Sequence, residues 1–242
     1  MAVLQLAGFA AFITASLVLG TRLILLWRRT REWPELTIGA AFWLAGGLGY
    51  TAWLVIGVLM NAEASLATIK QAATLGLAST VLGAICHGIG TVIIFRSGKR
   101  WARVFATCMA LALLASWCFY VSRPTGQSTP QFWLTIAMAS PLYLWSAIEA
   151  ISLGGVLQKR ARLGLSDPLV ANRTMLFGLC SAAVVVSITI SYSSQLVFGA
   201  TPPVWTATLA SSSLLIGAGA IWLGFFPPAS YRARIERAVE AS

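Results

Sequence analysis

Two ionisable side chains lie deep inside apolar stretches of this chain, and their types could do chemistry. His87, the only histidine, stands in GAICHGIGTVIIFR, and Glu149 stands in PLYLWSAIEAISLGG. Each lies about eight residues from the same end of its apolar segment, so a rise of about 1.5 Å per residue places both roughly 12 Å from that end. A carboxylate in lipid is costly and normally finds a partner. We therefore predict that His87 hydrogen-bonds Glu149, or that both line one hydrated cavity.

Two roles fit such a buried ionisable pair. It could be a proton-linked switch, because imidazole titrates near neutral pH, or a polar contact that holds two helices together. No nucleophile–base pair and no cluster of metal ligands stands out, so we expect no catalytic residue, no metal and no enzyme activity. The cysteines all lie in apolar segments and are expected to be buried free thiols; they are Cys86, Cys108, Cys118 and Cys180.

The elements that must position these residues are apolar helices. The 242 residues are 58% hydrophobic and 10% charged, with a mean hydropathy of +0.80, whereas a soluble domain carries about a quarter charged residues. Crossing a membrane takes about 20 apolar residues. We predict an all-α bundle of seven transmembrane helices, forming one domain over 1–226, with a short basic tail over 227–242. The predicted segments are 3–26, 36–60, 71–95, 104–121, 132–157, 174–198 and 204–226.

The loops between these segments differ in charge on the two sides. All basic residues except Lys70 and Arg123 fall in, or next to, the loops after the first, third, fifth and seventh segments. Positive loops face the cytoplasm, so we expect the N-terminus outside and the C-terminus inside, in a bacterial inner membrane. The first segment lacks a preceding basic region and a cleavage site, so we expect it to be retained. The net charge of +10 then reflects topology, and no nucleic acid is expected.

Proline and its neighbours mark the expected helix starts. Pro34, followed by Glu35, indicates the start of the second helix, and Ser166 or Asp167 can cap the sixth, with Pro168 in its first turn.

Two further features predict irregular helices. Pro141 is the one clear breaker near the middle of the fifth segment. In the second segment Gly46, Gly47 and Gly49 can bend the helix or let another helix pack closely.

Aromatic and hydroxyl side chains gather in the half of the bundle expected to face outside. A few polar groups among aromatic rings are typical of a small-molecule pocket. The same residue types also form interfacial belts and helix contacts. The candidate pocket residues are Trp53, Trp117, Ser191, Gln195, Trp205, Thr208 and Ser212.

The tail has an amphipathic pattern. Tyr231, Ile235 and Val239 recur at helical spacing, and the arginines fall between them. The pattern predicts a short helix on the anionic inner leaflet.

Two inner stretches, RTREWPELTIG and LSDPLVANRTMLFG, resemble segments of uncharacterised bacterial seven-helix membrane proteins. That resemblance implies the architecture and no activity. Seven helices with the N-terminus outside are also similar to retinal proteins and G-protein-coupled receptors. However, the chain has no lysine after Thr174, which excludes a covalent retinal, and GFFPPASY replaces the receptor motif NPxxY. No cofactor is expected.

Three functions stay open at this point. The first is a receptor-like sensor that binds a small apolar molecule in the outer half and signals to a membrane or cytoplasmic protein through the basic inner loops. The second is a small-molecule or proton-linked transporter that uses His87 and Glu149. The third is an accessory subunit of a membrane complex, with the bilayer and other proteins as its only partners.

Overall fold

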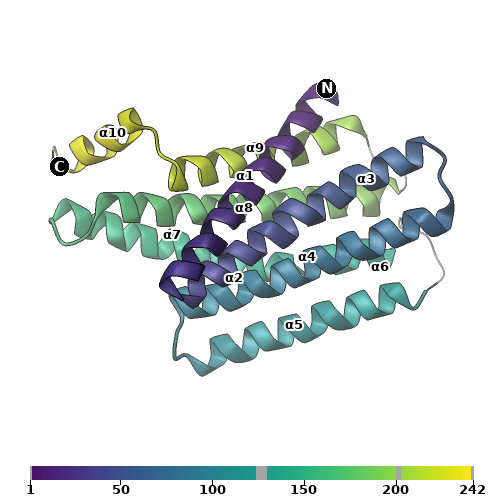
Figure 1. The fold of residues 1–242 in the computed structure, drawn as a ribbon, viewed down its shortest axis with the longest axis horizontal. Coiled ribbons are helices and arrows are strands. Elements are labelled where there is room, and N and C mark those ends of the chain that lie inside the picture. The colour runs from purple at the N-terminus through teal and green to yellow at the C-terminus, as the bar shows by residue number, and fades with distance from the viewer. Residues whose placement is uncertain (1, 124–129, 200–202, 241–242) are drawn as a thin grey trace.

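A computed structural model describes residues 2–123, 130–199 and 203–240, and all regular structure in these ranges is helical (Figure 1). Seven helical spans in this part of the chain are long and apolar enough to cross a membrane, as predicted. They extend a few residues beyond several predicted ends, because the helices continue into charged residues at their termini. The spans are Leu6–Thr30, Trp33–Asn61, Leu66–Phe95, Arg100–Val121, Gln131–Arg162, Pro168–Phe198 and Val204–Phe225.

Two of the seven spans are divided into shorter helices. The second consists of α2 (Trp33–Ala41), the π-helix η1 (Phe42–Gly49) and α3 (Tyr50–Asn61), and the fifth of α6 (Pro130–Ala137) and α7 (Ser140–Arg162). The remaining helices are α1 (Ala2–Thr30), α4 (Leu66–Phe95), α5 (Arg100–Val121), α8 (Pro168–Phe198), α9 (Val204–Phe225) and α10 (Ala229–Glu240).

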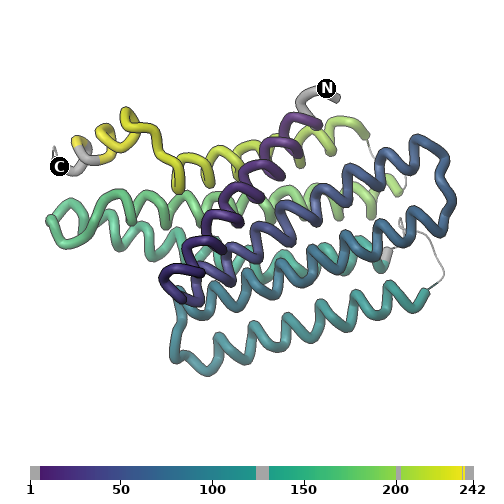
Figure 2. The backbone as a smooth tube through the Cα atoms, viewed as in Figure 1, coloured from purple at the N-terminus to yellow at the C-terminus, as the bar shows by residue number. Residues whose placement is uncertain are grey.

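The spans run side by side, and α1 crosses them obliquely (Figures 1 and 2). The closest neighbours are α7 with α8, α8 with α9, and α1 with α9, while α4 packs on the α2–η1–α3 span. Helix α5 lies at the edge, packed mainly on α4 and α6, so most of its apolar face is outside the protein core. The interior between α1, α4, α7 and α8 is where a buried site can form.

The π-helix lies where the glycines of the second segment predicted an irregularity. A Cβ on Gly46 would overlap the side chain of Ser16 in α1. On the other side, a Cβ on Gly83 of α4 would lie 2.6 Å from the Cβ of Ala45. Close approach of both neighbouring helices therefore requires glycine here.

The fifth span breaks where Pro141 predicted it. The chain makes a turn at Met138 and Ala139, and Pro141 occupies the first turn of α7. Proline has no N–H to donate and sterically hinders a helix that would continue through it. Two of the seven spans therefore leave α-helical geometry part of the way across.

The predicted helix starts agree with the structure. Asp167 is the N-cap of α8, and its carboxylate accepts the N–H of Leu169 at 2.8 Å. Pro168 follows in the first turn. Pro34 likewise lies in the first turn of α2. Proline suits this position because the N–H that it lacks would have no acceptor within the helix.

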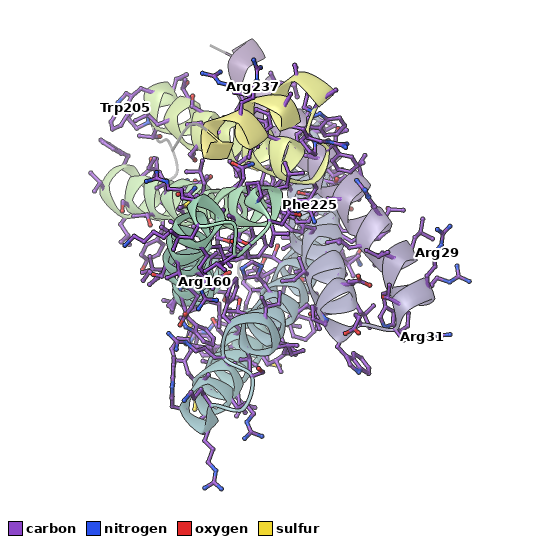
Figure 3. All side chains as sticks on the ribbon, turned by 90° about the vertical axis from the view of Figure 1, so that its left-hand side faces the viewer. Arg29, Arg31, Arg160, Trp205, Phe225 and Arg237 are labelled. Atoms are coloured by element: carbon purple, nitrogen blue, oxygen red, sulfur yellow. The ribbon has the colours of Figure 1, made fainter. Side chains whose placement is uncertain are left out.

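One end of the bundle, called the basic end below, is formed by the ends of α1, α4, α7 and α9 and the start of α8. Figure 3 views this end and shows Arg29 and Arg31 pointing away from the helices. Two arginines instead bind the last carbonyls of α9. Arg22 donates to the oxygen of Phe225 at 2.9 Å, and Arg173 to that of Gly224 at 3.2 Å. Such contacts satisfy a helix C-terminus.

Helix α10 leaves the bundle beyond the basic end and packs on α7 and α8 (Figure 1). Tyr231 donates to the Oδ1 of Asn172 at 3.3 Å, and Ile235 lines a cleft against the α7–α8 hairpin. The arginines of α10, Arg232, Arg234 and Arg237, are exposed. The side chain of Val239 lies outside the described residues.

Candidate functional site

Glu149 is paired, but not with His87. Its Oε1 accepts a hydrogen bond from the Nε of Arg96 at 2.7 Å and another from the Nε1 of Trp145 at 3.0 Å. Its side chain is only 11% exposed, and that of Arg96 is 41% exposed. Arg96, the residue that caps α4, thus extends back along α7 to neutralise a carboxylate inside the span.

His87 lies among aromatic rings in the centre of the bundle. Its ring lies 4.6 Å from that of Tyr143 on α7 and stacks on Phe177 of α8 at 5.7 Å. His87 is 3% exposed, and its Nε2 has no hydrogen-bond partner among the described residues. A buried polar atom without a partner is costly, so the Nε2 of His87 is a candidate contact for a water or for a ligand atom.

The predicted contact between His87 and Glu149 is therefore wrong. The two residues were also expected at the same depth, but His87 packs level with Tyr143, and Glu149 follows Tyr143 by six residues, about 9 Å nearer the basic end along α7. Glu149 faces the end of α4 and Arg96, whereas His87 faces Tyr143 and Phe177. The pair does not line one cavity either.

A cavity of about 180 Å³ lies in the half of the bundle away from the basic end. We call it the aromatic cavity. The side chains of Trp53 and Trp133 face each other in its wall, with ring centroids 5.2 Å apart. No acidic or basic residue among those that the structure describes lines it. Its lining residues are Phe9, Ala45, Tyr50, Trp53, Thr80, Trp133, Ile136, Tyr143, Val184, Ser187, Ile188 and Ser191.

Both irregular helices border this cavity. Ala45 belongs to η1, and Tyr50 is the residue directly after it. Ile136 precedes the break between α6 and α7, and Tyr143 follows it. Departures from helical geometry inside a membrane are tolerated where the backbone is buried or lines a cavity, and π-helical turns are frequent at functional sites.

The structure brings two of the seven predicted pocket residues, Trp53 and Ser191, to this cavity. Trp117 instead donates from Nε1 to the carbonyl of Thr74 at 3.4 Å, between α5 and α4. Gln195 is half-buried in α8 and does not line the cavity.

The three predicted pocket residues on α9 also lie elsewhere. Trp205 is 54% exposed and packs on Phe198. Thr208 donates to the carbonyl of Val204 at 3.0 Å, and Ser212 to that of Thr208 at 2.9 Å. Hydroxyls that bond one turn back satisfy their own helix and need no ligand.

Several cavity residues were missed because isolated aromatics in an apolar helix resemble ordinary core. Tyr50, Trp133 and Tyr143 are of this kind. The available signal was local: Tyr50 follows the glycine run directly, and Tyr143 lies two residues after Pro141. Aromatic residues next to a predicted helix irregularity are therefore better pocket candidates than aromatics at helix ends.

A chamber of about 30 Å³ lies next to the aromatic cavity, on the side of His87, with enough room for about one water molecule. The two spaces share four lining residues, Ala45, Tyr50, Tyr143 and Val184. The chamber is also lined by His87 and Ser181, which do not line the aromatic cavity. A ligand in the aromatic cavity could thus place one polar atom toward His87, directly or through a water.

The size and lining of this site limit what it can bind. An apolar cavity of about 150 Å³ in a protein core holds a molecule the size of benzene. The aromatic cavity is slightly larger and offers hydroxyls from Tyr50, Ser187 and Ser191. An uncharged one-ring molecule with a single polar group fits this chemistry, whereas an ion would meet no opposite charge.

Comparisons of the chain with protein-family models, with curated proteins and with solved structures found no match. The site is therefore interpreted from its own geometry.

Proposed function

We propose that this protein is a receptor-like membrane module that binds a small, uncharged, mostly apolar molecule in the aromatic cavity. The observation that carries the proposal is the unpartnered Nε2 of His87, in the small chamber beside an aromatic cavity that no charged residue of the described part of the chain lines. Two irregular spans border the same cavity. A ligand bound there would therefore contact the two segments in which the regular pattern of α-helical hydrogen bonds is interrupted.

In this proposal the protein lies in a bacterial inner membrane with its basic end in the cytoplasm, following the positive-inside rule. The exposed arginines of α10 and of the α7–α8 hairpin, Arg160 and Arg237 among them (Figure 3), then face a cytoplasmic partner. Labelling in intact cells tests this orientation. On a background without native cysteines, an impermeant maleimide should label Ser65→Cys and leave Ser97→Cys unlabelled. The reverse labelling would overturn the assignment.

The ligand proposal is tested with phenol and benzoate, which share a benzene ring and differ in charge. Phenol should raise the melting temperature of the detergent-solubilised protein in a concentration-dependent way, because it binds only the folded state. Benzoate should leave the melting temperature unchanged.

A matched pair of variants identifies the site of binding. Ser191→Phe fills the aromatic cavity and should abolish the phenol effect. Ser193→Phe, two residues away on an exposed face of α8, should preserve it. Equal phenol effects in both variants would contradict binding in the aromatic cavity. Native mass spectrometry of protein released gently from its own membrane would then give the mass of the natural ligand.

A further inference from the structure

A second cavity of similar size lies on the other side of His87, near the basic end. Its volume is about 200 Å³, against about 180 Å³ for the aromatic cavity. Glu35 and Arg173 contribute its charged groups, and its other lining residues are Leu23, Pro34, Ile38, Ile94, Phe95, Leu153, Thr174, Phe177 and Phe225. We call it the basic-end cavity. The two cavities therefore have room for molecules of similar volume.

One layer of rings separates the two cavities. Phe177 lines the basic-end cavity, stacks on His87 at 5.7 Å and meets Phe42 edge-on at 6.4 Å. His87 and Phe42 in turn line the small chamber that shares wall residues with the aromatic cavity. The aromatic cavity, the chamber, this ring layer and the basic-end cavity therefore follow one another through the bundle.

His87 and Phe177 of the ring layer belong to the continuous helices α4 and α8, whereas Phe42 and the neighbouring Tyr143 belong to the two interrupted spans. Phe42 is the first residue of the π-helix η1. Tyr143, which packs on His87, lies in the first turn after the break between α6 and α7. Interrupted helices around a central binding site are typical of alternating-access transporters.

We propose that the two cavities are the ends of one route across the bundle, and that the protein carries its small ligand past the layer formed by Phe42, His87 and Phe177. This inference rests on the proposed binding in the aromatic cavity and goes beyond it, because a receptor needs no second cavity. Rotation of the Phe177 side chain away from His87 and Phe42 would join the two spaces. Glu35 and Arg173 lie at the far cavity, where the ligand would leave or enter.

The test needs no natural ligand. On a background with the four native cysteines replaced, Thr80→Cys reports on the aromatic cavity and Thr174→Cys on the basic-end cavity. A small uncharged reagent, hydroxyethyl methanethiosulfonate, is added to one side of oriented vesicles, with excess glutathione on the other side to consume reagent that crosses the lipid. Each cysteine should react rapidly from its own side and at least tenfold more slowly from the other. Phe177→Ala should remove this difference for Thr80→Cys.

Two controls keep the result interpretable. Phe225→Ala enlarges the basic-end cavity but leaves the ring layer unchanged. Thr80→Cys should therefore still react faster from its own side in this variant. If Phe177→Ala fails to fold, Phe177→Leu replaces it. No reaction of Thr80→Cys from the basic side, with Phe177 or without it, would overturn the route. Because phenol stabilisation is measured separately, a protein that binds phenol but shows no access from the basic side remains a receptor, and the carriage proposal alone fails.

Discussion

Arg96 reaches back from the end of α4 to hold the carboxylate of Glu149, with 2.7 Å between its Nε and Oε1. The contact is the only salt bridge in the described part of the chain. It fixes α4 against α7 on the side where Trp101 and Trp145 pack at 5.7 Å. This cluster also ties the peripheral helix α5 to the rest of the bundle, since Trp101 belongs to α5.

Removing the arginine should destabilise the protein. In Arg96→Met the carboxylate keeps only Trp145 as a donor, so we expect a lower free energy of unfolding in mixed micelles, with a smaller loss than for a fully buried pair because Arg96 is partly exposed. Adding Glu149→Gln should recover part of the loss. A double-mutant cycle without coupling would show that the contact contributes nothing to stability.

His87 and Glu149 should behave independently. They have separate partners, so the effects of His87→Gln and Glu149→Gln on unfolding should add to within about 0.5 kcal/mol. The same micelle measurement checks this. Coupling well above that value would mean that the two side chains meet in the membrane-embedded protein.

The crossing of α4 and η1 should not tolerate a larger residue. In Gly83→Ala the added Cβ would lie 2.5 Å from the backbone nitrogen of Ala45, and overpacking of this kind costs about 1–3 kcal/mol. Gly219→Ala is the matched control, because nothing lies within 4 Å of its added Cβ. It should be neutral or stabilise by up to about 1 kcal/mol. Equal melting temperatures for the two variants would contradict the close crossing.

The contact of α10 with the hairpin predicts a protease phenotype. Ile235→Asp places a charge in the cleft against α7 and α8, so α10 should detach and trypsin should cleave at its arginines several-fold faster. Ser230→Asp, at an exposed position of the same helix, should not change the rate. Equal cleavage rates for the three proteins would show that α10 is not held by this contact.

The number and extent of the membrane-crossing helices could be predicted because each depends on local apolar length. The start of α8 at Asp167 and Pro168 and the break before Pro141 are likewise local properties of the backbone. These features need no knowledge of which helices are neighbours.

The site could be predicted only in part, because it depends on how the helices are rotated. Trp53 and Ser191 line the aromatic cavity, but Trp205 on an equally aromatic-rich segment faces outward. The partner of Glu149 was missed for a related reason. Arg96 lies beyond the end of its helix, and only the packing of α4 on α7 shows that its long side chain reaches inward.

The π-helix has a consequence for chain length. Each residue turns an α-helix by about 100°, and a π-helical stretch accommodates a residue that regular α geometry would not. Deleting one residue between Phe42 and Gly49 would leave the segment apolar and restore a regular helix. Because an α-helix turns more per residue than a π-helix, α3 would then keep nearly its present orientation, whereas winding all eight residues as a regular α-helix would rotate α3 and take Trp53 away from the cavity. The phase of α3, and with it the shape of the cavity, is therefore encoded by the count of residues in this stretch as much as by their identity.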